Sequence, residues 1–290
     1  ASLAGRGMEL ALVLDVSGSM SGEIPSLRMA VTSLLDEIYG NADTAPNVWV
    51  ALVPFSGRVN VINYGAGWLT GPPTMSNGPT AAVGNSCKVN SVNTNYPRLC
   101  PQRRAPTADQ DDTLPSAAAF DEYTSDWEVC PVPRAIGLSP RRSDIQPFVN
   151  SLCAGHGTST YEGMAWGWRA LSPRWQGLWG SATLPKSNAD SPGKYAVIMT
   201  DGQNHPNQSG DALSTAEADA KLLQTCQAMK AEGITIFAVT FNMGGALASL
   251  YQQCTSKPEY QYDAESGAEL DAVFTEIGKI VSRGDVRLLE

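Results

Sequence analysis

A carboxylate and two hydroxyls occupy alternate positions in the segment Asp15-Val16-Ser17-Gly18-Ser19. This segment directly follows the apolar run at residues 10–14, which has the composition of a buried strand. Oxygen donors at the end of such a strand would gather at the rim of a sheet, and hard divalent cations prefer oxygen ligands. The spacing therefore predicts a cation site, with Mg²⁺ as the expected ion and Ca²⁺ or Mn²⁺ as alternatives.

Two later segments carry further oxygen donors. Gly157-Thr158-Ser159-Thr160 opens a predicted helix, and Thr200-Asp201-Gly202 directly follows the apolar strand at 195–199. Ligands of an open parallel sheet bind outside the carboxyl ends of its strands, so Thr158 and Asp201 are expected to join the first segment at one site. Each of these residues taken singly could instead cap a helix or occupy a turn.

Both histidines of the chain, His156 and His205, flank these later segments. An imidazole there could be an extra ligand, or could make the rim of the site sensitive to pH. Because the expected ligands are all oxygen atoms, we place the two histidines at the rim rather than among the metal ligands.

The elements that must position these residues alternate along the chain. Apolar residues recur at helical spacing from Leu27 to Ile38, between Pro25 and Gly40. A continuous apolar strand at 48–53 is followed by an alternating, half-exposed strand at 58–62, and the short link between them predicts a hairpin at one sheet edge.

The second half of the chain repeats the alternation of strands and helices. We predict a strand at 195–199, a helix at 215–232, a strand at 234–239, a short helix at 246–254, a small strand at 260–262 and a final helix around 270–281. This order is typical of an α/β fold. We expect a Rossmann-like, doubly wound, mostly parallel six-stranded sheet with helices on both faces and one antiparallel edge strand.

Residues 63–142 are rich in Pro, Gly, Asn and Thr and are too long for an ordinary connection. We predict that they form a long irregular insertion in a single domain made of 1–62 and 143–290. Their low apolar content suggests that disulfides rather than a core of their own would keep them ordered. The alternative is a partly disordered flap.

The six cysteines contain no CxxC pair and have few histidines beside them, which argues against a zinc site. Their even number favours disulfides and an extracytoplasmic location, in the periplasm or at the cell surface, over reduced thiols buried in a cytosolic core. Connectivity cannot be deduced from a single sequence. The pairs that we predict are Cys226 with Cys254, Cys87 with Cys100, and Cys130 with Cys153.

The net charge of −9 argues against nucleic-acid binding, which requires a basic face. No apolar run is long enough to span a membrane, so no membrane contact is expected of this chain. The abrupt start at Ala1 and the ending Leu289-Glu290 lead us to expect a fragment from which an anchor or a signal has been removed.

The oxygen-bearing segments resemble the von Willebrand factor type A domain and its metal-ion-dependent adhesion site. That pattern is DxSxS, then a threonine in a Gly-Thr loop, then a TDG-type aspartate, and it is matched here by Asp15, Ser17, Ser19, Thr158 and Asp201. The resemblance implies that the three hydroxyls bind the cation directly, whereas the two carboxylates bind it directly or through water. A cation with few direct carboxylates remains able to bind an acidic residue of a partner protein.

A narrower resemblance is to the TadG-like pilus-assembly proteins. It rests on Cys130-Pro131-Val132-Pro133-Arg134, on Leu138-Ser139-Pro140, and on the segment from Gly163 to Pro173. Those bacterial proteins have an N-terminal inner-membrane anchor and a C-terminal von Willebrand type A region in the periplasm. The resemblance implies a role in Tad/Flp pilus assembly or surface adhesion, with a pilus or cell-envelope protein as partner.

Trp166 and Trp168 lie within this last segment. We expect them on opposite sides of one helix, one packed and one at the surface. An exposed tryptophan near the metal would instead be an interface anchor.

The sequence lacks the GxSxG and GxxxxGK[ST] motifs, so we expect no enzymatic activity. The favoured hypothesis is a metal-dependent protein-binding module. The alternative is a structural assembly or anchoring factor in which the metal only stabilises loops. A metal-dependent hydrolase is the least favoured, because it would need more direct carboxylates and a general base.

Overall fold

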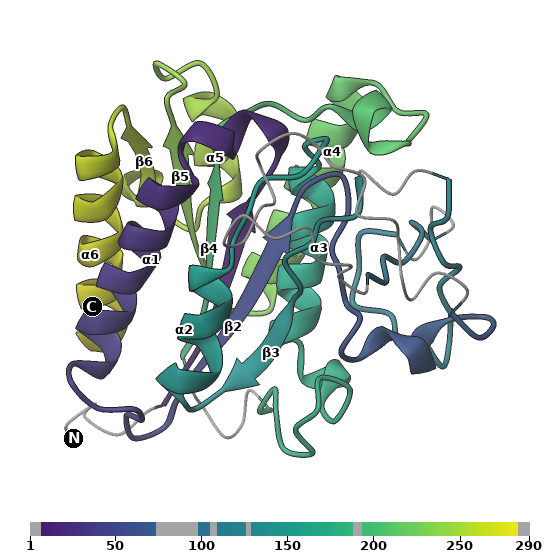
Figure 1. The fold of residues 1–290 in the computed structure, drawn as a ribbon, viewed down its shortest axis with the longest axis horizontal. Coiled ribbons are helices and arrows are strands. Elements are labelled where there is room, and N and C mark those ends of the chain that lie inside the picture. Colours follow the sequence, from purple (N-terminus) through teal and green to yellow (C-terminus); the bar gives the residue numbers. More distant parts are fainter. Residues whose placement is uncertain (1–6, 74–97, 105–108, 126–128, 188–192, 284–290) are drawn as a thin grey trace.

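A six-stranded sheet forms the centre of the computed structural model, which describes residues 7–73, 98–104, 109–125, 129–187 and 193–283 (Figure 1). The strand order is β3-β2-β1-β4-β5-β6. The strands are β1 (Met8–Asp15), β2 (Val48–Phe55), β3 (Ile136–Ser139), β4 (Gly193–Thr200), β5 (Thr235–Phe241) and β6 (Gln261–Ala264). Neighbouring strands are parallel except for β2 and β3, which are antiparallel. The predicted fold class is confirmed.

Helices cover both faces of this sheet. One layer holds α1 (Ile24–Tyr39), α2 (Arg142–Asn150) and α6 (Gly267–Arg283), and the other holds α3 (Thr160–Leu171), α4 (Thr215–Ala231) and α5 (Ala248–Cys254). Side chains of β1 alternate between the two layers, so Leu12 packs in the first core and Val13 in the second. Burial on both faces explains why the central strands are continuously apolar.

The predicted strand at 58–62 is wrong, because the antiparallel edge strand is β3. Residues 58–62 make only isolated bridges, Phe55 with Val59 and Asn60 with Arg134. Arg58 and Asn60 are fully buried, where Arg58 pairs with Asp211. Alternation of polar and apolar residues predicts solvent on one side of a strand, but here residues 58–61 are buried on both sides.

Residues from the range 63–142 join the core of the sheet domain. Strand β3 lies in this range, and Trp68 packs against Trp166, Trp175 and Trp179 with ring centroids 5.1–5.8 Å apart. Phe120 also contacts Trp166, at 5.2 Å. Packing of Trp68 and Phe120 onto Trp166 of α3 therefore anchors these described residues of the range to the sheet domain.

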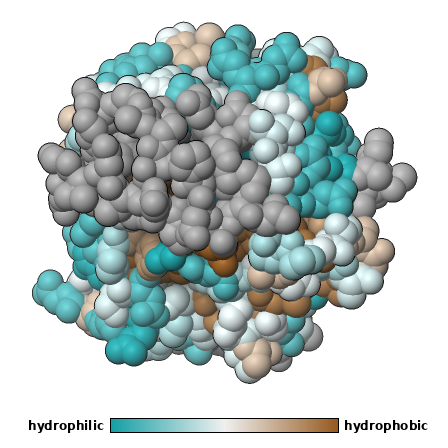
Figure 2. Space-filling model, turned by 45° about the vertical axis from the view of Figure 1, so that its right-hand side comes forward, coloured by the Kyte–Doolittle hydropathy of each residue, from teal (hydrophilic) through white to brown (hydrophobic). Residues whose placement is uncertain are grey.

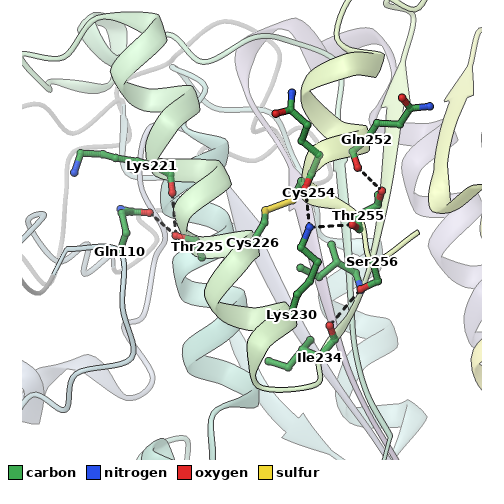
Figure 3. The surroundings of a disulfide bond; sticks show 12 residues. Gln110, Lys221, Thr225, Cys226, Lys230, Ile234, Gln252, Cys254, Thr255 and Ser256 are labelled. Carbon is green, nitrogen blue, oxygen red and sulfur yellow. Dashed lines mark hydrogen bonds between the residues drawn. A yellow bond between two sulfur atoms is a disulfide. The ribbon is translucent and has the colours of Figure 1, made fainter. Parts of the chain in front are cut away.

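Two disulfides have both of their cysteines among the described residues. Cys226–Cys254 joins α4 to α5, as predicted (Figure 3). The predicted pairs Cys87–Cys100 and Cys130–Cys153 are wrong, because Cys100 is bonded to Cys130. Cys153 is also in a disulfide, whereas Cys87 lies outside the described residues. Contacts between segments bring residues 100 and 130 together: the Arg98 side chain donates to the Cys130 carbonyl, and the Tyr123 N–H donates to the Cys100 carbonyl.

Both tryptophans of α3 are buried, with Trp166 1% and Trp168 5% exposed, so the expectation of one surface tryptophan is wrong. Trp166 lies in the aromatic cluster with Trp68, and the Trp168 Nε1 donates to Glu232 Oε2 over 2.9 Å. Trp68 and Phe120 lie against the Trp166 side of α3, and Glu232, which follows α4, lies against the Trp168 side. Neither ring is available as an interface anchor.

The surface is mainly polar where the structure describes it. Figure 2 shows hydrophilic residues interspersed with smaller hydrophobic areas on one side of the molecule. Among the described residues, Met29 is the only large hydrophobic residue in the exposed class, at 51%. None of the helices in the described ranges has the length and apolarity that crossing a bilayer requires.

Candidate metal centre

The carboxyl end of β1 places Asp15 at the edge of the sheet between the two helical layers. Its side chain is fully buried. Its Oδ1 accepts a hydrogen bond from the Ser17 backbone N–H (2.7 Å), and its Oδ2 accepts one from the Thr200 hydroxyl at the end of β4 (2.5 Å). Because β1 and β4 are neighbours in the sheet, their ends hold this carboxylate in one orientation.

A chain of hydroxyl groups connects the β1 loop to the β4 loop. The Ser19 hydroxyl donates to Asp201 Oδ1 over 2.8 Å, and the Ser17 and Ser19 hydroxyl oxygens are 3.0 Å apart. A hydroxyl has a single proton, so Ser17 must donate to Ser19 while Ser19 donates to Asp201. The lone pairs of Ser17 therefore remain available to a cation.

Thr158 lies on a third loop, just before α3. Its methyl group lies close to Gly202, the residue after Asp201. If Gly202 carried a Cβ, that atom would be 4.0 Å from the Thr158 methyl group. Its carbonyl accepts the backbone N–H of His205 over 2.8 Å, and the same loop contacts the β1 loop through Gly155 N–H and Val16 O (2.6 Å). Asp15 at the end of β1 and the other four residues predicted from the sequence therefore lie at three chain segments that contact one another.

The electrostatics of the cluster are those of two carboxylates without a counter-charge. Burial, followed by the nearby charge of Asp201, raises the pKa of Asp15 to about 7, against the hydrogen bonds from Thr200 and Ser17. Burial also raises the pKa of Asp201. Among the described residues, no lysine or arginine forms an ion pair with either carboxylate. A bound cation would supply the missing positive charge.

The donor set suits a hard cation. In the described part of the chain, no three residues drawn from His, Cys, Asp and Glu come together as metal ligands. Carboxylates alone therefore cannot complete a coordination shell here, and hydroxyls would have to contribute. Two carboxylates with three hydroxyls form an all-oxygen set, which fits Mg²⁺ and related ions rather than zinc.

The two histidines lie beside this cluster. His156 is exposed and its carbonyl accepts the Gly57 N–H over 3.0 Å, whereas His205 is half-buried and bonded to Thr158 through its backbone. Their loops are therefore adjacent to the candidate ligands. A role for the imidazole groups remains a prediction.

Sequence reasoning missed two groups of supporting residues. Thr200 holds Asp15, as described above, and its only sequence signal was its place directly before Asp201. The second group surrounds Asp211. Its carboxylate accepts two hydrogen bonds from the Arg58 guanidinium (2.7 and 2.9 Å) and a third from the Tyr161 hydroxyl. Burial alone would raise the pKa of Asp211, but these hydrogen bonds lower it below its usual value.

The Asp211 group ties Arg103 to the loop that follows Asp201. The Arg103 Nε is 3.5 Å from Asp211 Oδ1, and Arg103 also pairs with Asp109 at 2.8 Å. Lys221 of α4 pairs with the same Asp109 at 2.6 Å. Arg103 is therefore connected to the loop after Asp201 and to α4 by ion pairs to two buried carboxylates, for which composition gave no signal.

Comparisons with known proteins bear on the fold. No family model matches the sequence, and no curated protein matches it. Among solved structures, the von Willebrand factor domain of the type V pili tip protein Mfa5 from Porphyromonas gingivalis has a TM-score of 0.55 at 11% identity, covering 95% of each chain. This chain has the von Willebrand factor type A fold.

A second similar structure is the pilus adhesin SpaC from Lactobacillus rhamnosus GG in its open conformation. Its TM-score is 0.56 at 15% identity, and the match covers 97% of this chain but only 30% of SpaC. A structure of three N-terminal domains of Mfa5 matches with a TM-score of 0.51 at 12% identity, over 94% of this chain and 49% of that one. Such low identities establish the shared fold alone.

Proposed function

We propose that this protein is a non-enzymatic, metal-dependent protein-binding module that captures an acidic residue of a partner protein. The observation that carries the proposal is the Ser17–Ser19–Asp201 hydrogen-bond chain, which joins two loops beside the buried Asp15. Ser17, Ser19 and Thr158 would hold the cation directly, and Asp15 and Asp201 directly or through water. The bound cation, Mg²⁺ with Ca²⁺ or Mn²⁺ as alternatives, supplies positive charge for an incoming carboxylate.

The exposure of the cluster supports a site that is open on one side. Asp15 and Ser17 are buried, with 0% and 1% exposure, whereas Ser19 is exposed and Asp201 is half-buried. The buried oxygens of Asp15 and Ser17 would lie on the interior side of a cation bound here, and solvent would lie on the side of Ser19 and Asp201. A partner carboxylate could therefore reach it without rearrangement of the core.

Contacts within the protein argue against a purely structural metal. Ser19 bonded to Asp201, Thr200 bonded to Asp15, and the backbone of His205 bonded to Thr158 already close the three loops. A cation is not needed to hold them together. The protein-binding hypothesis is favoured over the assembly factor for this reason, and the hydrolase remains the least favoured because it would need more direct carboxylates.

We further propose an extracytoplasmic setting, in the periplasm or at the cell surface. The disulfides support an oxidising compartment. The printed names of the similar structures, a pilus adhesin and a pili tip protein, support a role in pilus assembly or surface adhesion. In the TadG-like interpretation an inner-membrane anchor would belong to the native protein, and a pilus or cell-envelope protein would be the partner.

The test is capture of envelope proteins on the immobilised chain in Mg²⁺, followed by elution with a chelator. We expect partner proteins to elute with the chelator, and Ser19→Ala to capture none of them while remaining folded by circular dichroism. Thr225→Val is the control, since the buried Thr225 of α4 donates to Gln110 and not to a candidate ligand (Figure 3). Capture that persists in the chelator or in Ser19→Ala would refute the proposal.

A further inference from the structure

Asn204 is buried in the loop between β4 and α4, three residues after Asp201, with 1% exposure. Its Oδ1 accepts hydrogen bonds from both the backbone N–H and the hydroxyl of Thr160, each 2.8 Å long. Its Nδ2 donates to Asp219 Oδ1 over 2.8 Å. A backbone N–H can only donate and a carboxylate can only accept, so the orientation of the Asn204 amide is fixed by its partners.

These bonds connect three separate elements. Thr160 is the first residue of α3, two residues after Thr158, and Asp219 lies in the second turn of α4. The first N–H groups of a helix have no partner within the helix, and Asn204 satisfies that of Thr160. The neighbouring His205 N–H bonds to the Thr158 carbonyl over 2.8 Å, so two consecutive residues hold the start of α3.

Thr158 is the one candidate ligand that lies on a loop of its own. The β1 and β4 loops are joined directly through Ser19 and Asp201. The Thr158 loop is joined to the β4 loop through residues 204 and 205. The Gly155 N–H bond to Val16 O fixes the start of the Thr158 loop, and Asn204 fixes its end at Thr160, so the position of the Thr158 hydroxyl depends in part on the contact that Asn204 makes.

We propose that Asn204 is a positioning residue, which sets the affinity of the site for its cation by locking the Thr158 loop to the Asp201 loop. The inference rests on the proposed function, since it concerns the same site. Mutation of a residue that orients metal ligands through hydrogen bonds, without itself binding the metal, typically lowers metal affinity by about 10–100-fold. We expect a loss of this size from Asn204→Ala.

The test measures Mn²⁺ and Mg²⁺ affinity by calorimetry, together with hydrogen exchange of the Thr160 amide in the metal-free protein. Asn204→Ala should weaken binding by about 10–100-fold and expose the Thr160 amide to exchange. Asn204→Asp alone should also weaken binding, because it places a second carboxylate against Asp219. In the double variant N204D/D219N, the new carboxylate at position 204 accepts from Thr160, and the new amide at position 219 donates to position 204. This variant should recover the metal affinity of the unmodified protein to within about threefold.

Thr225→Val, on the same helix as Asp219, is the control for a general loss of stability, because it removes a buried hydrogen bond to Gln110 (2.9 Å) on the side of α4 that faces the insertion. If Asn204→Ala and Thr225→Val both lower the melting temperature and both leave metal affinity unchanged, Asn204 is merely structural and the inference is wrong, while the metal site stands. A folded N204D/D219N variant without recovered affinity would also overturn it. If the unmodified protein binds neither ion, the proposed function itself fails.

Discussion

Metal affinity should depend on pH in a way that the buried position of Asp15 determines. In the metal-free protein its pKa is raised to about 7, chiefly by burial and then by the charge of Asp201. A cation binds the ionised carboxylate, so binding must displace the proton below this pH. Affinity should fall about tenfold per pH unit below 7 and level off above it. Between pH 6 and pH 8 the ionised fraction rises from about a tenth to about nine tenths, which predicts roughly a ninefold gain.

The stability of the metal-free protein should move in the opposite direction. A carboxyl whose pKa is raised on folding favours the folded state when protonated, so its contribution is complete below the unfolded value. For Asp15 it is lost as the pH rises from 3.8, the ordinary value, toward 7. Excess Mg²⁺ should therefore raise the urea midpoint slightly at pH 5.5 and strongly at pH 8.

Calorimetric titration with Mn²⁺ between pH 5.5 and pH 8.5 checks this reasoning. His156 and His205 lie beside the site, so the double variant His156→Gln/His205→Gln is the control. We expect the variant to keep the same pH profile. An affinity that is constant across the range refutes the argument, and a profile that disappears in the double variant assigns the proton to a histidine instead of Asp15.

Two further perturbations test the parts of the fold that hold the site. Replacing Cys226 and Cys254 by Ala opens a link with a sequence separation of 28, and should lower the free energy of unfolding by about 3–4 kcal/mol in guanidine titrations. The C-terminal end of α5 should stay in place, because the Lys230 ammonium group donates to the Gln253 and Thr255 carbonyls at 2.7 and 3.1 Å (Figure 3). A decrease in the free energy of unfolding of less than about 1 kcal/mol would contradict the argument that the disulfide stabilises by closing a loop in the unfolded chain. Arg58→Met removes the guanidinium group that donates two hydrogen bonds to the buried Asp211. It should lower the free energy of unfolding by about 3–5 kcal/mol, and the decrease should be smaller when Asp211→Asn is added. Equal costs for the single and double variants in urea denaturation would show that the pair is not coupled.

Local patterns in the sequence determined the fold class and the members of the candidate site. Continuous apolar strands such as β1 must be buried on both faces, which requires helices on both sides of a parallel sheet. Since parallel strands end at one edge, Asp15 at the end of β1 and Asp201 after β4 had to lie close together. The predicted pair Cys226–Cys254 joins α4 to α5, with only β5 between these helices in the chain.

Only the tertiary structure decided which distant residues support that site. Asn204 bonds to Thr160, 44 residues away, and Thr200 bonds to Asp15, 185 residues away. The edge strand β3, the Cys100–Cys130 pair and the packing of Trp68 against Trp166 also depend on contacts between segments far apart in the chain. A polar residue that is buried and fully bonded has the same letter in the sequence as one exposed to water. Its role is therefore fixed by the partners that folding brings to it, and not by its neighbours in the chain.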